Sequence, residues 1–148
     1  NCPFAVGGTN KFNKYVPALQ TFYLAEGFDG DTKTVLDLAD DAANANWGGS
    51  WRMPTITEFG ALISVKEWDS TNKGYKFGTS PNQIFLPAAG FGIDTRLEDY
   101  GSSGMYWSSS LITGVPNSAS YLLINGSSAE TNHSSERRLG LSVRALSD

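Results

Sequence analysis

Two stretches near the C-terminus decide the fold: Gly104–Ser110, GMYWSSS, and Arg137–Leu146, RRLGLSVRAL. The first is short and aromatic and begins with glycine, which favours a buried strand. The second alternates apolar with small or charged residues, a period of two that predicts a strand with one buried face. We expect Trp107 and Leu141 to be nearly inaccessible to solvent in adjacent or near-adjacent strands.

The segment between these two strands, Leu111–Glu136, is almost free of charge and rich in Ser, Asn, Thr and Gly. The alternation within it predicts one strand, Ser118–Ile124, with Leu122 and Ile124 inward and Tyr121 and Leu123 outward. Long loops in compact domains are usually functional. We therefore interpret the flanking strands as scaffold and this segment as the working surface.

The composition is that of one domain, residues 1–148, long enough to bury a core. The chain is 40% hydrophobic with a net charge of -4, and this acidic balance argues against nucleic acid as a partner. The single cysteine, Cys2, excludes an intradomain disulfide and a four-cysteine zinc site. We interpret Cys2 as incidental. No apolar run reaches membrane-spanning length, and we expect the chain to be cut from a longer precursor or a larger protein.

The first part of the chain predicts an irregular lead-in and a helix. Residues 1–40 are a lead-in in which Leu19–Ala25 favours a strand. Thr32–Trp47 has apolar residues at helical spacing, and Gly48-Gly49 ends that helix.

A second helix is expected after Pro54, because Thr55 and Glu58 form the capping-box pattern T-x-x-E. Short segments separated by turns follow it. The order of one strand, two helices and then many short strands predicts the α+β class.

Several separated motifs resemble one family. They are DAANANWGGSWRMPT (Asp41–Thr55), Thr57-Glu58-Phe59, IFLPAAGF (Ile84–Phe91), GMYWSSS (Gly104–Ser110) and GLSVR (Gly140–Arg144). In this order they resemble the Fibrobacter succinogenes major paralogous domain and the related DUF1566 domains. The resemblance covers about Asp41 to the end of the chain.

This resemblance implies a C-type lectin-like fold with two helices and a small, twisted, mostly antiparallel sheet. Similar members occur in surface proteins of gut Bacteroidales, including pilus-tip adhesins, and in phage proteins. The wider group includes the variable proteins of diversity-generating retroelements, whose C-terminal variable residues form a ligand-binding face. It also includes formylglycine-generating enzymes, which use a cysteine pair. With Cys2 alone that activity is not expected, and we predict that the protein is not an enzyme.

The composition of Leu111–Ser135 agrees with such diversification. Mutated adenines in AAY codons never give Lys, Glu, Gln, Met or Trp. These five types supply 20 of the 148 residues but only Glu130 within Leu111–Ser135. Small-residue surface loops would show the same bias, and adaptable binding surfaces use the same residues.

The large aromatic residues allow two interpretations. A sugar-stacking surface is one, and burial in the core is the other. We favour the core, because each lies in a motif with apolar neighbours and large aromatics dominate core burial. We likewise expect Arg52 and Arg144 to be structural. The aromatic residues concerned are Trp47, Trp51, Phe91 and Trp107.

Metal and nucleophile sites are not predicted. His133, near Glu130 and Glu136, lacks metal-ligand spacing. Val115-Pro116-Asn117 resembles the Pro-Asn of sugar-binding lectins, but valine stands where their acidic residue would be, so we predict no calcium. Ser108–Ser110 has no base or acid at a recognisable position. We expect no cofactor.

The sequence therefore predicts a non-enzymatic binding module for an extracellular protein or glycan, at the surface of a cell, a pilus tip or a phage. Tyr121 is the expected anchor, because tyrosine supplies contact area at low entropy cost. The alternatives are a structural or assembly domain of a larger surface protein and, third, a relative of the formylglycine-generating enzymes. The predicted ligand-binding residues are Thr113, Val115, Asn117, Ser118, Tyr121, Leu123, Asn125, Ser127, Ser128, Asn132, His133 and Ser134.

Overall fold

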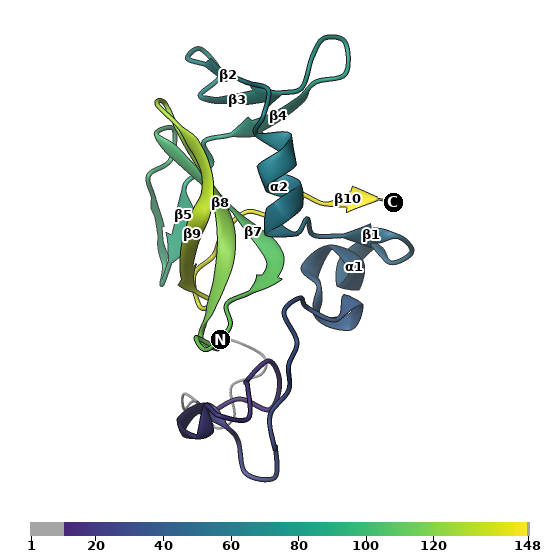
Figure 1. Ribbon diagram of the computed structural model, residues 1–148. Coiled ribbons are helices and arrows are strands. Elements are labelled where there is room, and N and C mark those ends of the chain that lie inside the picture. The colour runs from purple at the N-terminus through teal and green to yellow at the C-terminus, as the bar shows by residue number, and fades with distance from the viewer. Residues whose placement is uncertain (1–10, 148) are drawn as a thin grey trace.

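The computed structural model describes residues 11–147, which contain two α-helices and mostly antiparallel sheets (Figure 1). This arrangement confirms the α+β class. Predictions that concern Asn1–Asn10, Cys2 among them, lie outside the described residues. The helices are α1 (Ala42–Trp47) and α2 (Ile56–Leu62), with 3-10 turns at Thr21–Tyr23 and Leu38–Asp40. The strands are β1 (Trp51–Arg52), β2 (Lys66–Asp69), β3 (Gly74–Phe77), β4 (Ile84–Pro87), β5 (Phe91–Ile93), β6 (Arg96–Glu98), β7 (Ser103–Leu111), β8 (Ser118–Asn125), β9 (Ala129–Glu136) and β10 (Leu146–Ser147).

The antiparallel sheet β7-β8-β9 is the centre of the molecule. Strand β7 contains GMYWSSS, and β8 contains Ser118–Ile124, so both strand predictions are confirmed. Strand β9 was not predicted. The segment expected to be a long surface loop is instead the greater part of a β-hairpin.

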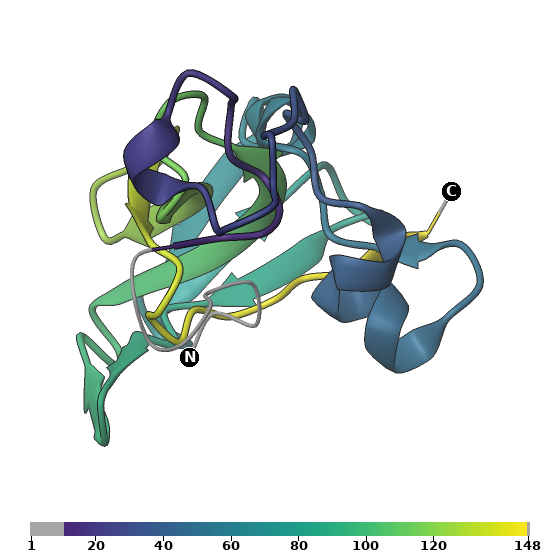
Figure 2. The same ribbon diagram turned by 90° about the horizontal axis from the view of Figure 1, so that it is seen from below.

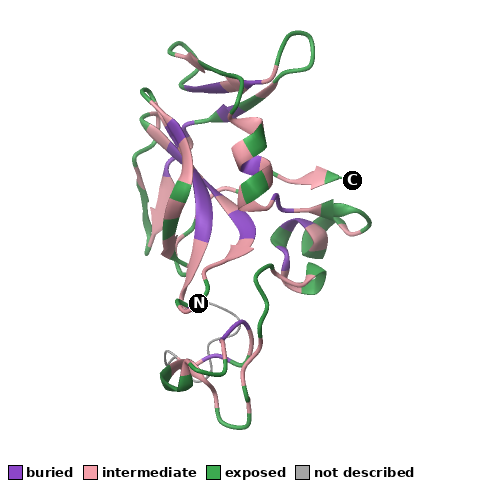
Figure 3. Ribbon diagram, viewed as in Figure 1, coloured by how far each residue is buried: buried purple, intermediate pink, exposed green. Residues whose placement is uncertain are grey.

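One face of this sheet packs on α2 and on strand β3. Leu122 and Ile124 are fully buried there, as their position in the alternation predicted. Tyr106 lies opposite Leu122 on β7, and Phe59 of α2 completes the contact. Figure 3 shows buried residues along β7, β8 and β3.

Helix α2 begins at the predicted capping box. Thr55 Oγ1 accepts a hydrogen bond from Glu58 N, and Glu58 accepts one from Thr55 N at 2.7 Å. Arg52 donates two further bonds to the same carboxylate, at 2.7 and 2.9 Å. The hydrogen bonds from Arg52, followed by those from Thr55, lower the pKa of Glu58 to about 2. Arg52 is therefore structural, although its partner is a carboxylate.

The prediction that Arg137–Leu146 forms one continuous strand was wrong. Arg137–Leu146 makes isolated pairings, Gly140 with Gly92 and Ser142 with Tyr106, and only Leu146–Ser147 forms a strand, β10 beside β1. Trp107 and Leu141 are partly exposed, and Tyr106 takes the buried position. The reason is that Tyr106, not Trp107, points to the α2 face.

The predictions for the first forty residues were also partly wrong. Leu19–Ala25 contains a 3-10 turn in place of a strand. The first helix starts at Ala42, ten residues after its predicted start, because Thr34–Leu36 pairs with the end of β7. Asp41 caps α1 with bonds from Ala43 N and Asn44 N, and its other oxygen accepts from Met53 N.

Among residues 11–147, no helix has the length and apolar character needed to cross a membrane.

Candidate functional site

The twelve predicted ligand-binding residues run from the β7–β8 connection along β8 and the β8–β9 turn into β9. Eight residues of β8 separate the β7–β8 connection from the β8–β9 turn, a distance of about 24 Å at strand rise. The two turns are therefore at opposite ends and cannot contact one small ligand together. The structure divides the predicted residues into two end groups and a middle group.

In the middle group, Tyr121, Leu123 and His133 lie on the sheet face opposite α2, whereas Asn132 and Ser134 alternate with His133 along β9. Trp107, Tyr121 and His133 are cross-strand neighbours on β7, β8 and β9. The Tyr121 ring lies 6.1 Å from that of Trp107, edge to face, and 5.7 Å from that of His133. These neighbours leave Tyr121 only 8% exposed. Tyr121 does point away from the α2 core as predicted, but the prediction that it is an exposed anchor was wrong.

Trp107, Tyr121 and His133 form a row of rings across the three strands, the aromatic row, and its edge on β9 is polar. His133 Nε2 lies 3.0 Å from Glu130 Oε2, and this hydrogen bond is the main reason that the pKa of Glu130 lies below its ordinary value. Leu123 is paired with Glu130 on the same face and is half-buried. Asn132 and Ser134 are exposed and alternate with His133 along β9.

The β8–β9 turn uses its polar groups internally. Asn125 Oδ1 accepts hydrogen bonds from Ser127 N and Ser128 N at 2.9 and 3.0 Å, and from the Ser127 hydroxyl at 2.7 Å. An asparagine that bonds the backbone two residues on is a turn-forming feature. Asn125, Ser127 and Ser128 thus shape the turn.

The β7–β8 connection, at the opposite end, forms one wall of a hollow of about 300 Å³. Figures 1 and 2 show the first described part of the chain beside this end of the sheet. The other wall comes from this part, residues 15–19 and 31–34. The lining residues are Tyr15, Pro17, Ala18, Leu19, Asp31, Thr32, Lys33, Thr34, Leu111, Ile112 and Thr113.

Main-chain bonds fix the two walls together. Leu111 N donates to Thr34 O at 2.8 Å, and Leu36 N donates to Ser109 O at 2.9 Å. Leu19 is 94% exposed at the hollow. The hollow therefore has a rigid base and an apolar, solvent-open part.

Asn117 and Ser118, at the same end, are held by Arg137. Its backbone N–H donates to Asn117 O at 2.9 Å, and its Nε donates to Ser118 O at 3.1 Å. Val115 is 43% exposed beside them. Of the four predicted residues at this end, only Thr113 lines the hollow.

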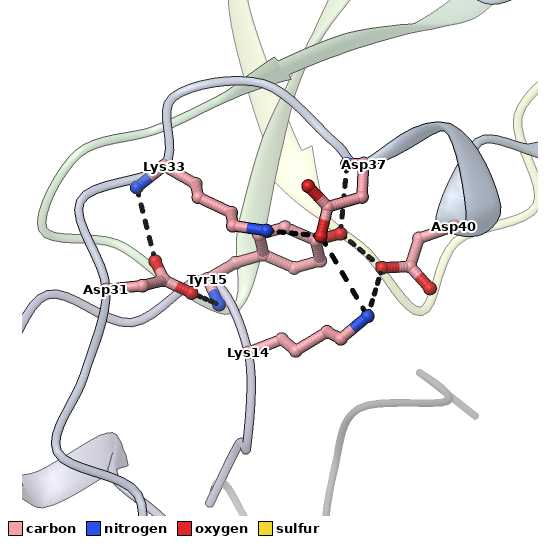
Figure 4. Close-up of polar contacts among 6 residues, drawn as sticks. All are labelled: Lys14, Tyr15, Asp31, Lys33, Asp37 and Asp40. Atoms are coloured by element: carbon pink, nitrogen blue, oxygen red, sulfur yellow. Dashed lines mark hydrogen bonds and ion pairs between the residues drawn. The ribbon is translucent and has the colours of Figure 1, made fainter.

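A network of charged groups includes three residues of this wall, Tyr15, Asp31 and Lys33 (Figure 4). Asp31 accepts from Tyr15 N at 2.7 Å, and Lys14 bonds Asp40 at 2.7 Å. The Tyr15 hydroxyl also contacts Asp40, and Lys33 pairs with Asp37. These bonds position Tyr15 and the 31–34 segment.

The network shifts three pKa values, and the hydrogen bond to Asp40 raises that of Lys14. Burial and the hydrogen bond to Asp40 raise the pKa of Tyr15 well above its usual range. Burial alone would raise the pKa of Asp40, but hydrogen bonds from Lys14 and Tyr15 outweigh it and lower that pKa. The ionised carboxylate is therefore the favoured form.

Sequence reasoning missed this second wall because residues 1–40 looked like an irregular lead-in. The available signal was the density of charge, because Asp31, Lys33, Asp37 and Asp40 fall within ten positions. It indicated charge pairing but not the partner wall, which is about eighty residues away in the sequence.

The aromatic residues assigned to the core are not all buried. Trp47 and Trp51 are 62% and 42% exposed, so their assignment to the core was wrong. Phe91 and Trp107 are partly exposed. Within the described part of the chain, no three His, Cys, Asp or Glu side chains gather as metal ligands would.

Comparison of the chain with protein-family models, with curated proteins and with solved structures finds no match.

Proposed function

We propose that the protein is a non-enzymatic binding module that captures an extracellular protein ligand in the hollow beside the β7–β8 connection. The observation that carries this proposal is the hollow itself. It is a pre-formed site near the lower limit of ligand-pocket volumes, and its walls are joined by main-chain hydrogen bonds.

The lining favours an apolar side chain as the bound group. Leu19, Leu111 and Ile112 supply apolar surface, and Thr113 supplies an exposed hydroxyl at the edge. Asp31 and Lys33 also line the hollow, but their charged groups are already engaged with Tyr15 N and with Asp37. An apolar side chain inserted in a fixed pocket is a common energetic centre of protein interfaces.

The α+β arrangement is compatible with the C-type lectin-like fold that the sequence resemblance implies. We propose this fold and the relationship to the Fibrobacter succinogenes major paralogous domain together with the binding function. The proposed setting is the surface of a bacterium, a pilus tip or a phage. Diversification would act on Leu111–Ser135, of which Leu111, Ile112 and Thr113 contribute to the hollow.

Occluding the hollow tests the proposal. Thr113→Trp places a large side chain at an exposed position of the lining, whereas Thr95→Trp makes the same change in the exposed β5–β6 turn. Proteins that the unmodified chain captures on an array of extracellular proteins are titrated against both variants. We expect Thr113→Trp to weaken binding about tenfold or more, which corresponds to about 1.4 kcal/mol, and Thr95→Trp to leave it unchanged.

Equal binding by the two variants would place the ligand elsewhere. The structural or assembly alternative would be favoured by two results together. The unmodified chain would capture no protein, and Thr113→Trp would weaken its attachment to a neighbouring domain.

A further inference from the structure

Two exposed tryptophans form a corner where the α1–β1 loop begins and ends, Trp47 at the end of α1 and Trp51 at the start of β1. The indole rings of Trp47 and Trp51 are 5.5 Å apart at an interplanar angle of 74°. Both are substantially exposed. In Figures 1 and 2 this loop projects beside β10, on the side of the molecule opposite β9. The corner is thus separate from the hollow described above.

Backbone geometry holds the corner in place. Gly48 and Gly49 have φ values of 67° and 58°, which ordinary side chains rarely adopt. They reverse the chain so that Trp51 returns beside Trp47, and Trp51 N donates to Gly48 O at 3.2 Å. Asn44 Nδ2 bonds both Gly49 O and Trp51 O, at 3.1 and 3.0 Å.

Strand β10 adds a second support. Trp51 pairs with Ser147, and the hydroxyls of Ser50 and Ser147 are 2.7 Å apart. The loop is therefore preorganised, so a ligand would bind without ordering it first.

The loop that carries the two rings is polar but contains no charged residue. No charged residue occurs from Ala42 to Trp51. Asn46 is exposed, and its Nδ2 bonds Ala42 O at 2.7 Å. The Oδ1 atoms of Asn44 and Asn46 accept no hydrogen bond from residues 11–147, so both amide oxygens remain available. Arg52, next in sequence, is neutralised by its two bonds to Glu58.

We propose that this corner, Trp47 and Trp51 with Asn44, Asn46 and Ser50, binds a neutral oligosaccharide. Pyranose rings whose hydroxyls are equatorial present a C–H face that stacks on an indole ring. Two rings set nearly at right angles would contact two faces of a sugar chain, and the amide and hydroxyl groups would bond its hydroxyls. The absence of charge in this loop excludes the pairing that a sulfated or uronic polysaccharide needs.

The exposed area favours a sugar over a protein. At about 250 Å² for a whole tryptophan side chain, the exposed fractions leave roughly 260 Å² on the two rings. A stable protein interface needs about 800 Å² on each partner. One or two pyranose units match the smaller area.

The test is titration of the chain with cellohexaose and chitohexaose, followed by tryptophan fluorescence and calorimetry. We expect millimolar or tighter binding of at least one sugar. Trp47→Ala and Trp51→Ala should each weaken it about tenfold or more, as loss of a central aromatic contact does. Tyr100→Ala, a control at another exposed aromatic, should bind like the unmodified chain. A hyaluronan hexasaccharide, which is charged, should not bind.

Further variants separate folding from binding. Trp47→Phe and Trp51→Phe should keep part of the affinity, and circular dichroism should show unchanged folding for all variants. Absence of binding by both neutral sugars would overturn the proposal, as would binding that survives the double alanine variant. Self-association that disappears in the alanine variants would identify a second copy of the chain as the occupant and would equally overturn it.

Discussion

The two faces of the sheet β7-β8-β9 carry aromatic and apolar side chains in nearly equal measure, yet they are covered differently. The inner face, with Tyr106, Leu122 and Ile124, packs on helix α2. On the outer face, Tyr121 is covered largely by its cross-strand neighbours, Trp107 and His133. Alternation along a strand therefore tells which side a residue points to, but it does not tell what lies against that side.

The largest expected difference between the faces concerns two adjacent leucines. Leu122 is fully buried on the inner face, and Leu123 is half-buried on the outer face. Leu122→Ala should lower the free energy of unfolding by about 3–4 kcal/mol through a cavity, and Leu123→Ala by about 1 kcal/mol. Urea denaturation of both variants measures the contrast. Equal losses would mean that the outer face is packed as tightly as the inner one.

Tyr121 gives the next largest effect and tests the aromatic row. Because the ring is 8% exposed between two neighbours, Tyr121→Ala should cost about 2 kcal/mol, less than a closed core cavity would. Tyr121→Phe should cost almost nothing, because the hydroxyl makes no hydrogen bond within residues 11–147. Thermal and urea unfolding compare the two variants. A stable Tyr121→Ala would show that the row does not cover the ring in solution.

What could be predicted from the sequence was local or periodic. The Thr55–Glu58 capping box specified the start of α2 because both partners lie within one turn. The period of two in β8 placed Leu122 and Ile124 correctly. Both features depend on residues a few positions apart.

What could not be predicted depended on distant partners. Thr34–Leu36 has neighbours at helical spacing, but its backbone bonds the end of β7, and this tertiary pairing overrides the propensity. The hollow has the same origin, since its walls come from segments about eighty residues apart in the sequence. Trp47 and Trp51 are exposed on either side of the glycine turn that joins the end of α1 to the start of β1.

The two faces also differ in the carboxylates beside them, Glu58 on the inner side and Glu130 on the outer side. Glu58 anchors the helix on the inner face, and its pKa is about 2 in place of the ordinary 4.5. A lowered pKa contributes stability that is present above pH 4.5 and is lost as the pH falls toward 2. Because the side chain is 39% exposed, solvent screening reduces the effect to about 1 kcal/mol.

Glu58→Gln should therefore be less stable than the unmodified chain at pH 7 and should approach it near pH 2. Glu67→Gln, a change on exposed strand β2, is the control and should follow the unmodified chain. Urea unfolding across this pH range provides the measurement. An unchanged difference between pH 7 and pH 2 would contradict the role given to the carboxylate.

Glu130 on the outer face gives the smallest effect. Its hydrogen bond with His133 lowers the pKa of the carboxyl, but the group is open to solvent. As with Glu58, the lowered pKa contributes to the free energy of unfolding above the ordinary pKa of the carboxyl group. That contribution fades as the pH falls through the lowered pKa. Carboxyl NMR titration should give a Glu130 pKa below its ordinary value, and His133→Gln should bring it back toward that value. The same variant should change the unfolding midpoint less than Glu58→Gln does, because exposed ion pairs contribute little. A larger change would show that the polar edge, and not the aromatic row alone, keeps the outer face in place.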